Sequence, residues 1–283
     1  MIPAKFDYVK PASVEDAVRA LADGGEDAKI IAGGQSLLPV LRLRMAAPTV
    51  VIDLGGIPEL RRIAEDGDRI AIGAMAPHHD VMRDHLVREH VSLLADATQT
   101  VADPQVRHRG TLGGALAHAD PAGDLGAVAL ALDAEFVIAG AGGTRTVQAS
   151  DFFLDYFTTA IGEGEILTQV RFPRYTGWKT HYEKFNRTAQ AWSMVAVAVA
   201  LRVDGGTIAE ARIGLTNMGT TPLRASGVEA ALVGQQATAD AARAAAEHAT
   251  EGTAAPSDAD AAADYREHLA RVLTGRAVLA AAG

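Results

Sequence analysis

The stretch IIAGGQSLLP, residues 30–39, places two glycines and a serine hydroxyl between an apolar run and a leucine-rich segment. A second glycine pair occurs in RGTLGGALAHADPAGD, residues 109–124, beside a threonine. Because glycine has no Cβ, consecutive glycines can turn their N–H groups toward one point and let a bulky anion approach the backbone closely. Either pair alone is more typical of a tight turn. Two such loops with neighbouring hydroxyls favour a ligand that carries phosphates.

Neither loop follows a standard nucleotide-binding pattern. GxGxxG and GxxxxGK[ST] match neither of them. In the first loop, Ser36 supplies the hydroxyl and opens the helical segment SLLPVLRLRM, whose positive N-terminal end would face the same point. In the second loop, Thr111 can supply the hydroxyl. The spacing by itself leaves the ligand unnamed.

Composition and charge limit the classes of function. The chain has 283 residues and a formal net charge of −9, so it lacks the basic surface that nucleic acid requires. Its longest clean apolar run, residues 194–201, is far below the roughly 20 residues that span a bilayer. The first residues, MIPAKFDYVKP, contain no apolar signal-peptide core. We therefore expect a cytoplasmic protein with no nucleic-acid partner and no transmembrane segment, associated with a membrane only through a complex.

The sequence contains no cysteine. Thiolates are the usual ligands of iron–sulfur clusters and the only source of disulfides, so this chain is expected to hold neither. A cysteine nucleophile and a cysteinyl-linked flavin are excluded for the same reason.

Hydrophobic patterning divides the chain into three regions, 1–57, 58–176 and 177–283. The first is expected to be β-α-β, with strands in AKIIAGG and TVVIDLGGI after a helix that Ser13 caps. The second is α+β, with strands in RIAIGAM, AEFVIAG and ILTQVRF and one long helical stretch from Val81 to about Val101. The third combines antiparallel strands in MVAVAVALRV and IAEARIGLTNM with an alanine-rich helical tail.

The segments AGGQSLLP and VADPQVRHRGTLGGALAHADPAGDL together resemble the flavoprotein subunits of the molybdenum hydroxylases, most closely the medium subunits of aerobic carbon monoxide dehydrogenases. The resemblance runs over the whole chain. It implies an α+β fold of two α/β subdomains that bind FAD, shared with vanillyl-alcohol oxidase and the flavin domain of xanthine dehydrogenase. A small third domain of antiparallel strands and helices would follow.

The resemblance also assigns two clamps on the FAD pyrophosphate. The first consists of Ala32, Gly33, Gly34, Gln35 and Ser36, and the second of Thr111, Leu112, Gly113, Gly114 and Ala115. Gln35 departs from the family, which often has histidine at this position. FAD would be bound non-covalently.

Four further positions follow from the same resemblance. Asp124 is expected to bond the ribityl or adenosine part of FAD, and Lys184 to lie near the isoalloxazine, where its charge would stabilise the anionic reduced ring. Leu167 matches an apolar contact, and Trp192 could cover the flavin. No residue of the chain is expected to act as a catalytic acid or base.

Other polar clusters have simpler explanations. His78, His79, His85 and His90 reproduce neither HExxH nor an i, i+4 pair, so they are expected to be helix and cap residues, and no metal site is predicted. A packing or capping role is expected for His118. Arg107 and Arg109 could serve phosphate, a partner or solvent equally well.

The implied function is electron transfer. Substrate would be oxidised at a molybdenum cofactor on a large partner subunit, and electrons would pass through [2Fe–2S] clusters on a small one to FAD in this chain and then to an external acceptor such as a quinone. A dimer of heterotrimers is expected. Carbon monoxide is the favoured substrate, while nicotine-, purine- and aldehyde-type substrates stay open. Two alternatives are a self-sufficient flavin oxidase of the same fold and a non-catalytic nucleotide-binding or assembly module.

Overall fold

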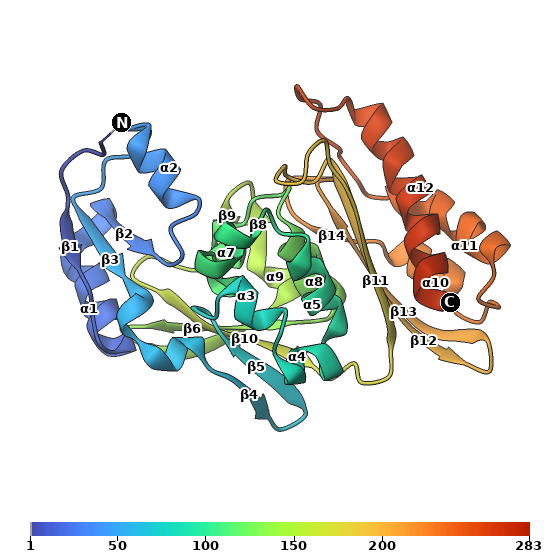
Figure 1. Ribbon diagram of the computed structural model, residues 1–283, viewed down its shortest axis with the longest axis horizontal. Helices are drawn as coiled ribbons and strands as arrows, with labels where there is room; N and C mark the ends of the chain where they lie inside the picture. Colours follow the sequence, from blue (N-terminus) through green and yellow to red (C-terminus); the bar gives the residue numbers. More distant parts are fainter. Residues whose placement is uncertain (1) are drawn as a thin grey trace.

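Three successive sheets run along the molecule in the computed structural model, which describes residues 2–283 (Figure 1). The first sheet is parallel, with strand order β1-β3-β2, and the chain passes through α1 and α2 between its strands. The elements of this region are β1 (Asp7–Val9), α1 (Val14–Gly24), η1 (Gly25–Asp27), β2 (Ala28–Ile31), α2 (Leu37–Arg42), β3 (Val50–Asp53), η2 (Leu54–Gly56) and η3 (Pro58–Arg61).

The predicted β-α-β unit at the first glycine loop is confirmed as β2, α2 and β3. Parallel pairing sets Ile30 beside Ile52, and Ile52 is fully buried. The Ser13 side chain accepts a hydrogen bond from the Asp16 N–H and so caps α1, as expected. Strand β1 was not predicted, since its three residues are all exposed.

The central sheet is antiparallel, with strand order β4-β5-β10-β6-β7. Short helices cover one face of it, and a two-stranded ribbon, β8–β9, lies on the same side of the sheet as these helices (Figure 1). The strands are β4 (Ile63–Asp66), β5 (Arg69–Gly73), β6 (Glu135–Gly140), β7 (Gly143–Gln148), β8 (Phe153–Asp155), β9 (Thr158–Thr159) and β10 (Ile166–Pro173). The helices are α3 (His78–Val81), α4 (His85–His90), α5 (Ser92–Gln99), α6 (Pro104–Arg109), α7 (Leu112–His118), α8 (Asp124–Ala131) and α9 (Ala149–Phe152).

The prediction of one long helix from Val81 to Val101 is wrong. The Asp84 carboxylate accepts hydrogen bonds from the N–H groups of Leu86 and Val87, and this cap starts a new helix, α4. Val91 leaves helical geometry, with φ −139° and ψ 44°, and separates α4 from α5. Three short helices therefore replace the single one.

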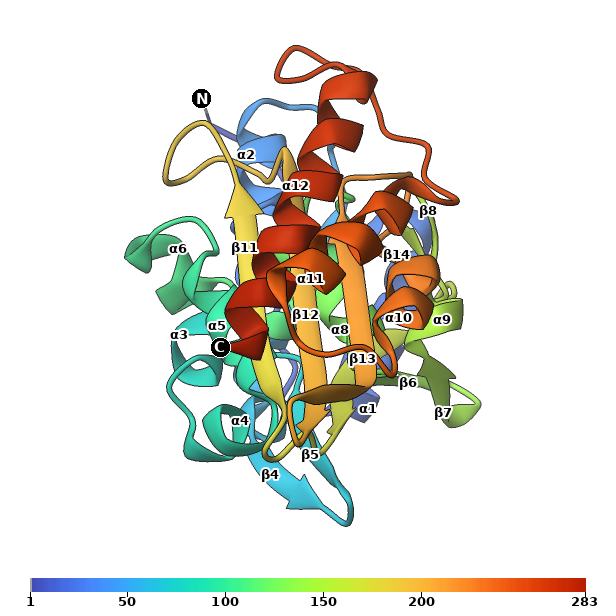
Figure 2. The same ribbon diagram turned by 90° about the vertical axis from the view of Figure 1, so that its right-hand side faces the viewer.

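The third sheet is antiparallel in the order β11-β12-β13-β14, and α12 lies across its outer face (Figure 2). Its strands are β11 (Lys179–Phe185), β12 (Val195–Asp204), β13 (Thr207–Thr216) and β14 (Leu223–Arg224). The helices after it are α10 (Ser226–Leu232), α11 (Ala239–Ala246), η4 (Glu247–Thr250) and α12 (Ala263–Ala282). The α+β class and the C-terminal unit of antiparallel strands and helices are confirmed.

Strand β12 explains why the run MVAVAVAL has no polar alternation. Its alanines, Ala196, Ala198 and Ala200, belong to the core that contains α5 and α8, whereas the alternate valines join the core beneath α12. Both faces are therefore covered. The fit to α8 is close, because a Cβ on Gly214 of β13 would overlap the Ala127 carbonyl.

The predicted boundaries at 57/58 and 176/177 stay predictions. The first falls between η2 and η3, and the second between β10 and β11. Among residues 2–283, no helix combines the length and apolarity needed to cross a bilayer.

Candidate functional site

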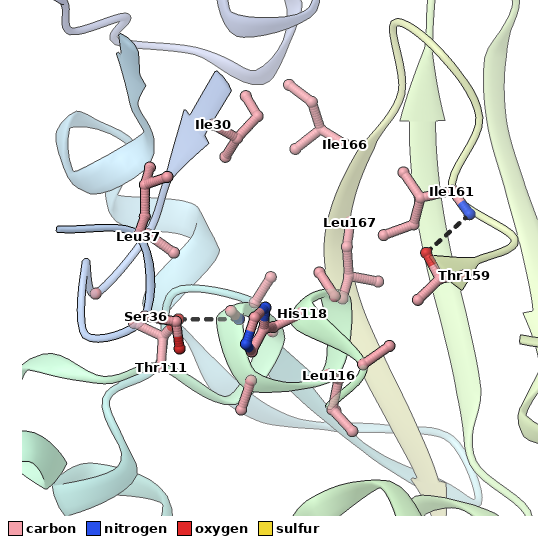
Figure 3. A pocket seen from close by; sticks show the side chains of 18 of the residues that line it. Ile30, Ser36, Leu37, Thr111, Leu116, His118, Thr159, Ile161, Ile166 and Leu167 are labelled. Atoms are coloured by element: carbon pink, nitrogen blue, oxygen red, sulfur yellow. Dashed lines mark hydrogen bonds between the residues drawn. The ribbon is translucent and has the colours of Figure 1, made fainter. Parts of the chain in front are cut away.

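A pocket of about 1660 Å³ lies where the first sheet, the central helices and strand β11 come together. Pockets for small ligands usually measure about 300–1,000 Å³, so this one suits a long ligand. Both glycine loops line it, and Figure 3 labels Ser36 of the first loop and Thr111 of the second among the lining residues. Every predicted site residue lines the pocket except Leu112.

The two glycine loops pack directly against each other. A Cβ on Gly33 would overlap the carbonyl oxygen of Arg109 and lie 2.6 Å from Gly110 Cα. A Cβ on Gly114 would lie 3.1 Å from Ala32 Cβ. Glycine is therefore required at Gly33 for two backbones to approach, a role that spacing in the sequence could not indicate.

In the first loop, the backbone donors are unused. The N–H groups of Gly33, Gly34, Gln35 and Ser36 donate to no acceptor in the part of the chain that the structure describes, residues 2–283. Gly34 has φ +74°, a conformation that side chains disfavour. Four successive backbone donors beside the pocket are available to an anion.

The side chains of this loop behave differently from one another. The Gln35 amide donates to the Gly33 carbonyl oxygen at 3.0 Å, so it braces its own loop. Ser36 immediately precedes α2, but its hydroxyl makes no capping hydrogen bond. The Ser36 hydroxyl can therefore donate to a ligand in the pocket.

In the second loop, the backbone donors are all engaged within the protein. Leu112 N–H donates to the Ala76 carbonyl oxygen at 3.0 Å, and Gly113 N–H to that of Ala74 at 2.9 Å. The Gly114 and Ala115 N–H groups donate to the side-chain and main-chain oxygens of Thr111 at 3.1 and 3.0 Å. In this loop, the Thr111 hydroxyl proton is the donor left for a ligand in the pocket.

Leu112 is the one member of the predicted second clamp that does not line the pocket. Its side chain is fully buried in the central core, where it packs with residues of β5 and α8, and it does not reach the pocket. Apolar side chains in the first turn of a helix that covers a sheet are drawn into the core.

His78 supports the second loop from below. Its N–H donates to the Gly110 carbonyl oxygen at 2.9 Å, and its ring is buried against Gly110, with Nδ1 lacking a partner. Burial, with a smaller contribution from the positive charge of Arg107, lowers the pKa of His78 to about 4. The imidazole is therefore neutral at pH 7. No local pattern distinguishes this buried histidine from its partly exposed neighbour His79.

Asp124 and Lys184 form a buried ion pair on the pocket wall. The Lys184 ammonium lies 2.8 Å from Asp124 Oδ2, and the two side chains are 6% and 4% exposed. Asp124 Oδ1 also accepts hydrogen bonds from the hydroxyls of Tyr182 and Ser193, each at 2.8 Å. Burial and the Asp124 charge raise the pKa of Tyr182 well above its usual value, so it stays a donor. Because the negative charge of Asp124 compensates the positive charge of Lys184, the pair adds little net charge to the pocket.

The remaining predicted residues occupy the rim and the far wall. Trp192 is 56% exposed at the rim, next to Gln190, whose amide donates to the Asp103 carboxylate. Leu167 of β10 points toward the pocket (Figure 3). His118 also lines it and packs on Phe157, with 5.1 Å between ring centroids.

Two family models cover nearly the whole chain. Residues 4–175 match the FAD binding domain in molybdopterin dehydrogenase. The chain belongs to this flavoprotein family. Residues 180–281 match the CO dehydrogenase flavoprotein C-terminal domain. The protein is accordingly an FAD-dependent oxidoreductase subunit, and FAD is its cofactor.

Individual relatives match this chain along nearly its full length. The carbon monoxide dehydrogenase medium chain of Hydrogenophaga pseudoflava is 42% identical over 284 residues, which are 99% of this chain and 98% of that one. The glyceraldehyde dehydrogenase medium chain of Sulfolobus acidocaldarius is 35% identical, with 98% of both chains covered. Among solved structures, carbon monoxide dehydrogenase from H. pseudoflava, in a form lacking the Mo-pyranopterin moiety, has a TM-score of 0.96 and 43% identity, covering 99% of this chain and 98% of that one.

The residues of the pocket fit FAD, which consists of two flat ring systems joined through a pyrophosphate. The free N–H groups of Gly33 to Ser36 supply donors for an anion, and apolar side chains such as Leu167 line the pocket on either side. The absence of a Cβ at Gly33 and Gly114 lets the two loops pack against each other where they line the pocket.

Proposed function

We propose that this flavoprotein is the FAD-carrying electron-transfer subunit of a molybdenum hydroxylase, and that the hydroxylase is an aerobic carbon monoxide dehydrogenase. The observation that carries the proposal is the row of unpaired backbone donors, Gly33 to Ser36, inside a pocket of an FAD-binding family member. The 42% identity to a carbon monoxide dehydrogenase medium chain supports the choice of substrate, since the glyceraldehyde relative is less similar.

The proposed roles of the residues follow from their geometry. The free N–H groups of the first loop and the hydroxyls of Ser36 and Thr111 bind the pyrophosphate, and the second loop holds the first in place. Leu167 gives an apolar contact to one end of FAD, and Trp192 covers the flavin at the other.

Asp124 and Lys184 orient the flavin end as a pair. Tyr182 and Ser193 hold the carboxylate in place, and the ammonium stays within the pocket wall. Bound FAD supplies the redox chemistry, while the chain positions it and sets its electrostatic surroundings. No side chain of this chain is assigned proton transfer to or from a substrate.

The proposal includes partners that bring electrons to this subunit. A large subunit with a molybdenum cofactor and a small iron–sulfur subunit are proposed, because the sequence offers no cysteine to ligate a cluster. The medium-chain designation of the relatives is consistent with such an assembly. We further propose a dimer of heterotrimers in the cytoplasm that passes electrons to a quinone or a similar acceptor.

Purification of the isolated chain and of the assembled complex tests the function. The isolated chain should contain FAD but neither iron nor molybdenum, and it should fail to oxidise carbon monoxide, purines or aldehydes with a dye acceptor. Addition of both partner subunits should start carbon monoxide oxidation. Turnover by the isolated chain would instead indicate a self-sufficient oxidase, and absence of flavin would indicate an assembly module. Oxidation of an aldehyde, a purine or nicotine, but not of carbon monoxide, by the complex would correct the substrate alone.

A further inference from the structure

Arg145 and Glu165 form a bidentate ion pair at one edge of the pocket. Arg145 Nε lies 2.8 Å from Glu165 Oε1, and Nη2 lies 2.6 Å from Oε2. The guanidinium also donates to the Ala160 carbonyl oxygen, and the Gly162 N–H donates to Glu165 Oε2 at 2.6 Å. Residues 160–165, which connect β9 to β10, are thereby fastened to strand β7 at both ends. We call this set of contacts the clasp.

The clasped segment is a wall of the pocket. Residues 161–165 all line it, as do the turn between β6 and β7 and Arg145 itself. Figure 3 shows Ile161 and Leu167 on one side of the pocket and Leu37 on the other. Displacement of the segment would therefore widen the space between these apolar side chains.

Two glycines allow the clasp to close. A Cβ on Gly140 would lie 3.1 Å from Glu165 Cγ, and one on Gly162 would lie 2.9 Å from Glu165 Oε2. Because neither residue has a Cβ, the Glu165 side chain can lie directly against the backbone at Gly140 and at Gly162. The Arg145 hydrogen bond lowers the pKa of Glu165, so the carboxylate is charged at neutral pH.

We propose that the clasp is a positioning device that keeps this wall closed on bound FAD and so slows loss of the cofactor. The proposal rests on the proposed function, since it concerns retention of FAD in the same pocket. The side chains of Arg145 and Glu165 are 45% and 21% exposed, so dissolved ions can reach and screen the pair. Retention of FAD should accordingly depend on salt through these two residues.

The test measures the rate at which FAD leaves the full-length protein, followed by flavin fluorescence at low and high salt. Arg145→Gln should release FAD about fivefold faster at low salt, as expected for loss of a two-pronged, partly exposed ion pair. High salt should bring the wild-type rate toward that of the variant. The charge swap Arg145→Glu with Glu165→Arg should recover part of the difference.

The matched control is Arg69→Gln, which breaks the 3.0 Å Arg69–Glu135 ion pair on the same sheet but outside the pocket. Its FAD release rate should equal that of wild type, and thermal unfolding of each apoprotein shows whether folding has changed. Equal release rates for Arg145→Gln and wild type would overturn the clasp while leaving the proposed function intact. A wild-type chain that binds no FAD would overturn the proposed function itself.

Discussion

The two glycine loops share a sequence pattern but use their backbones in opposite ways. Residues 33–36 line the pocket, their N–H groups have no acceptor among residues 2–283, and Gly34 adopts φ +74°. In residues 112–115, each N–H already has an acceptor within the protein. The first loop is therefore built to donate to a ligand, and the second is built to pack.

A glycine pair can thus serve either as a set of backbone donors or as a spacer between elements. Gly113 touches Ala74 so closely that no side chain fits, and Gly33 rests on the backbone of Arg109 and Gly110. The second loop thus fixes the position of the first. Substitutions in the two loops should consequently separate cofactor binding from folding.

The largest expected effect is on stability in the second loop. Gly113→Val would place Cβ 2.6 Å from Ala74 Cα, and overpacking of this kind should lower the free energy of unfolding of the apoprotein by about 3 kcal/mol. Urea denaturation measures the change. Gly142→Ala is the control, because a Cβ there meets no atom within 4 Å. An unchanged unfolding free energy in Gly113→Val would contradict the spacer role.

The next effect is a pH dependence that originates beneath the second loop. His78 has a pKa of about 4 in the folded protein and about 6.5 when unfolded, so the folded state binds fewer protons between these pH values. Stability should therefore fall as the pH is lowered through this window, by about 3 kcal/mol at pH 4. Replacement by Leu should remove this part of the dependence in denaturation curves measured from pH 7 to 4. Parallel curves for wild type and His78→Leu would contradict burial of the histidine.

In the first loop, substitution should affect cofactor binding more than folding. Gly34→Val forces a branched side chain into φ +74° and against Leu38, and the loop must shift to relieve this. We expect the dissociation constant for FAD to rise about tenfold or more, with a smaller loss of stability than in Gly113→Val. Gly34→Asn should lose less affinity, since asparagine tolerates this conformation. Fluorescence titration of apoprotein with FAD measures both variants, and wild-type affinity in Gly34→Val would remove the donor role.

The smallest effect is expected at Thr111, which caps α7 by accepting a hydrogen bond from the Gly114 N–H. Thr111→Val should lower the free energy of unfolding by about 1 kcal/mol. Thr111→Ser keeps the hydroxyl and should recover most of it. If both variants unfold at the same denaturant concentration, the cap contributes nothing measurable.

Local patterns in the sequence predicted much of the fold. The strand–loop–helix–strand unit around residues 28–53 and the paired strands β12 and β13 follow from dense apolar runs bounded by glycines. The break before α4 had a usable signal in Asp84, because aspartate is a strong N-cap residue. The break at Val91 had none, because valine is not a capping residue and no glycine or proline stands beside it.

Long-range contacts account for what the sequence could not predict in the site. The acceptors for Leu112 and Gly113 are carbonyls of Ala76 and Ala74, which follow a different element, β5. The ion pair between Lys184 and Asp124 joins residues that are 60 positions apart in the sequence. Such pairings depend on how the sheets are stacked, whereas glycine content and hydroxyl spacing are local properties.

The most direct test of the contrast between the loops is a titration of ¹⁵N-labelled apoprotein with FAD, followed through the backbone amide resonances. Binding of the pyrophosphate should shift the amide protons of Gly33 to Ser36 strongly to lower field, as new hydrogen bonds form, and should leave those of Leu112 to Ala115 nearly unchanged. Large shifts confined to the second loop, with none in the first, would contradict the account.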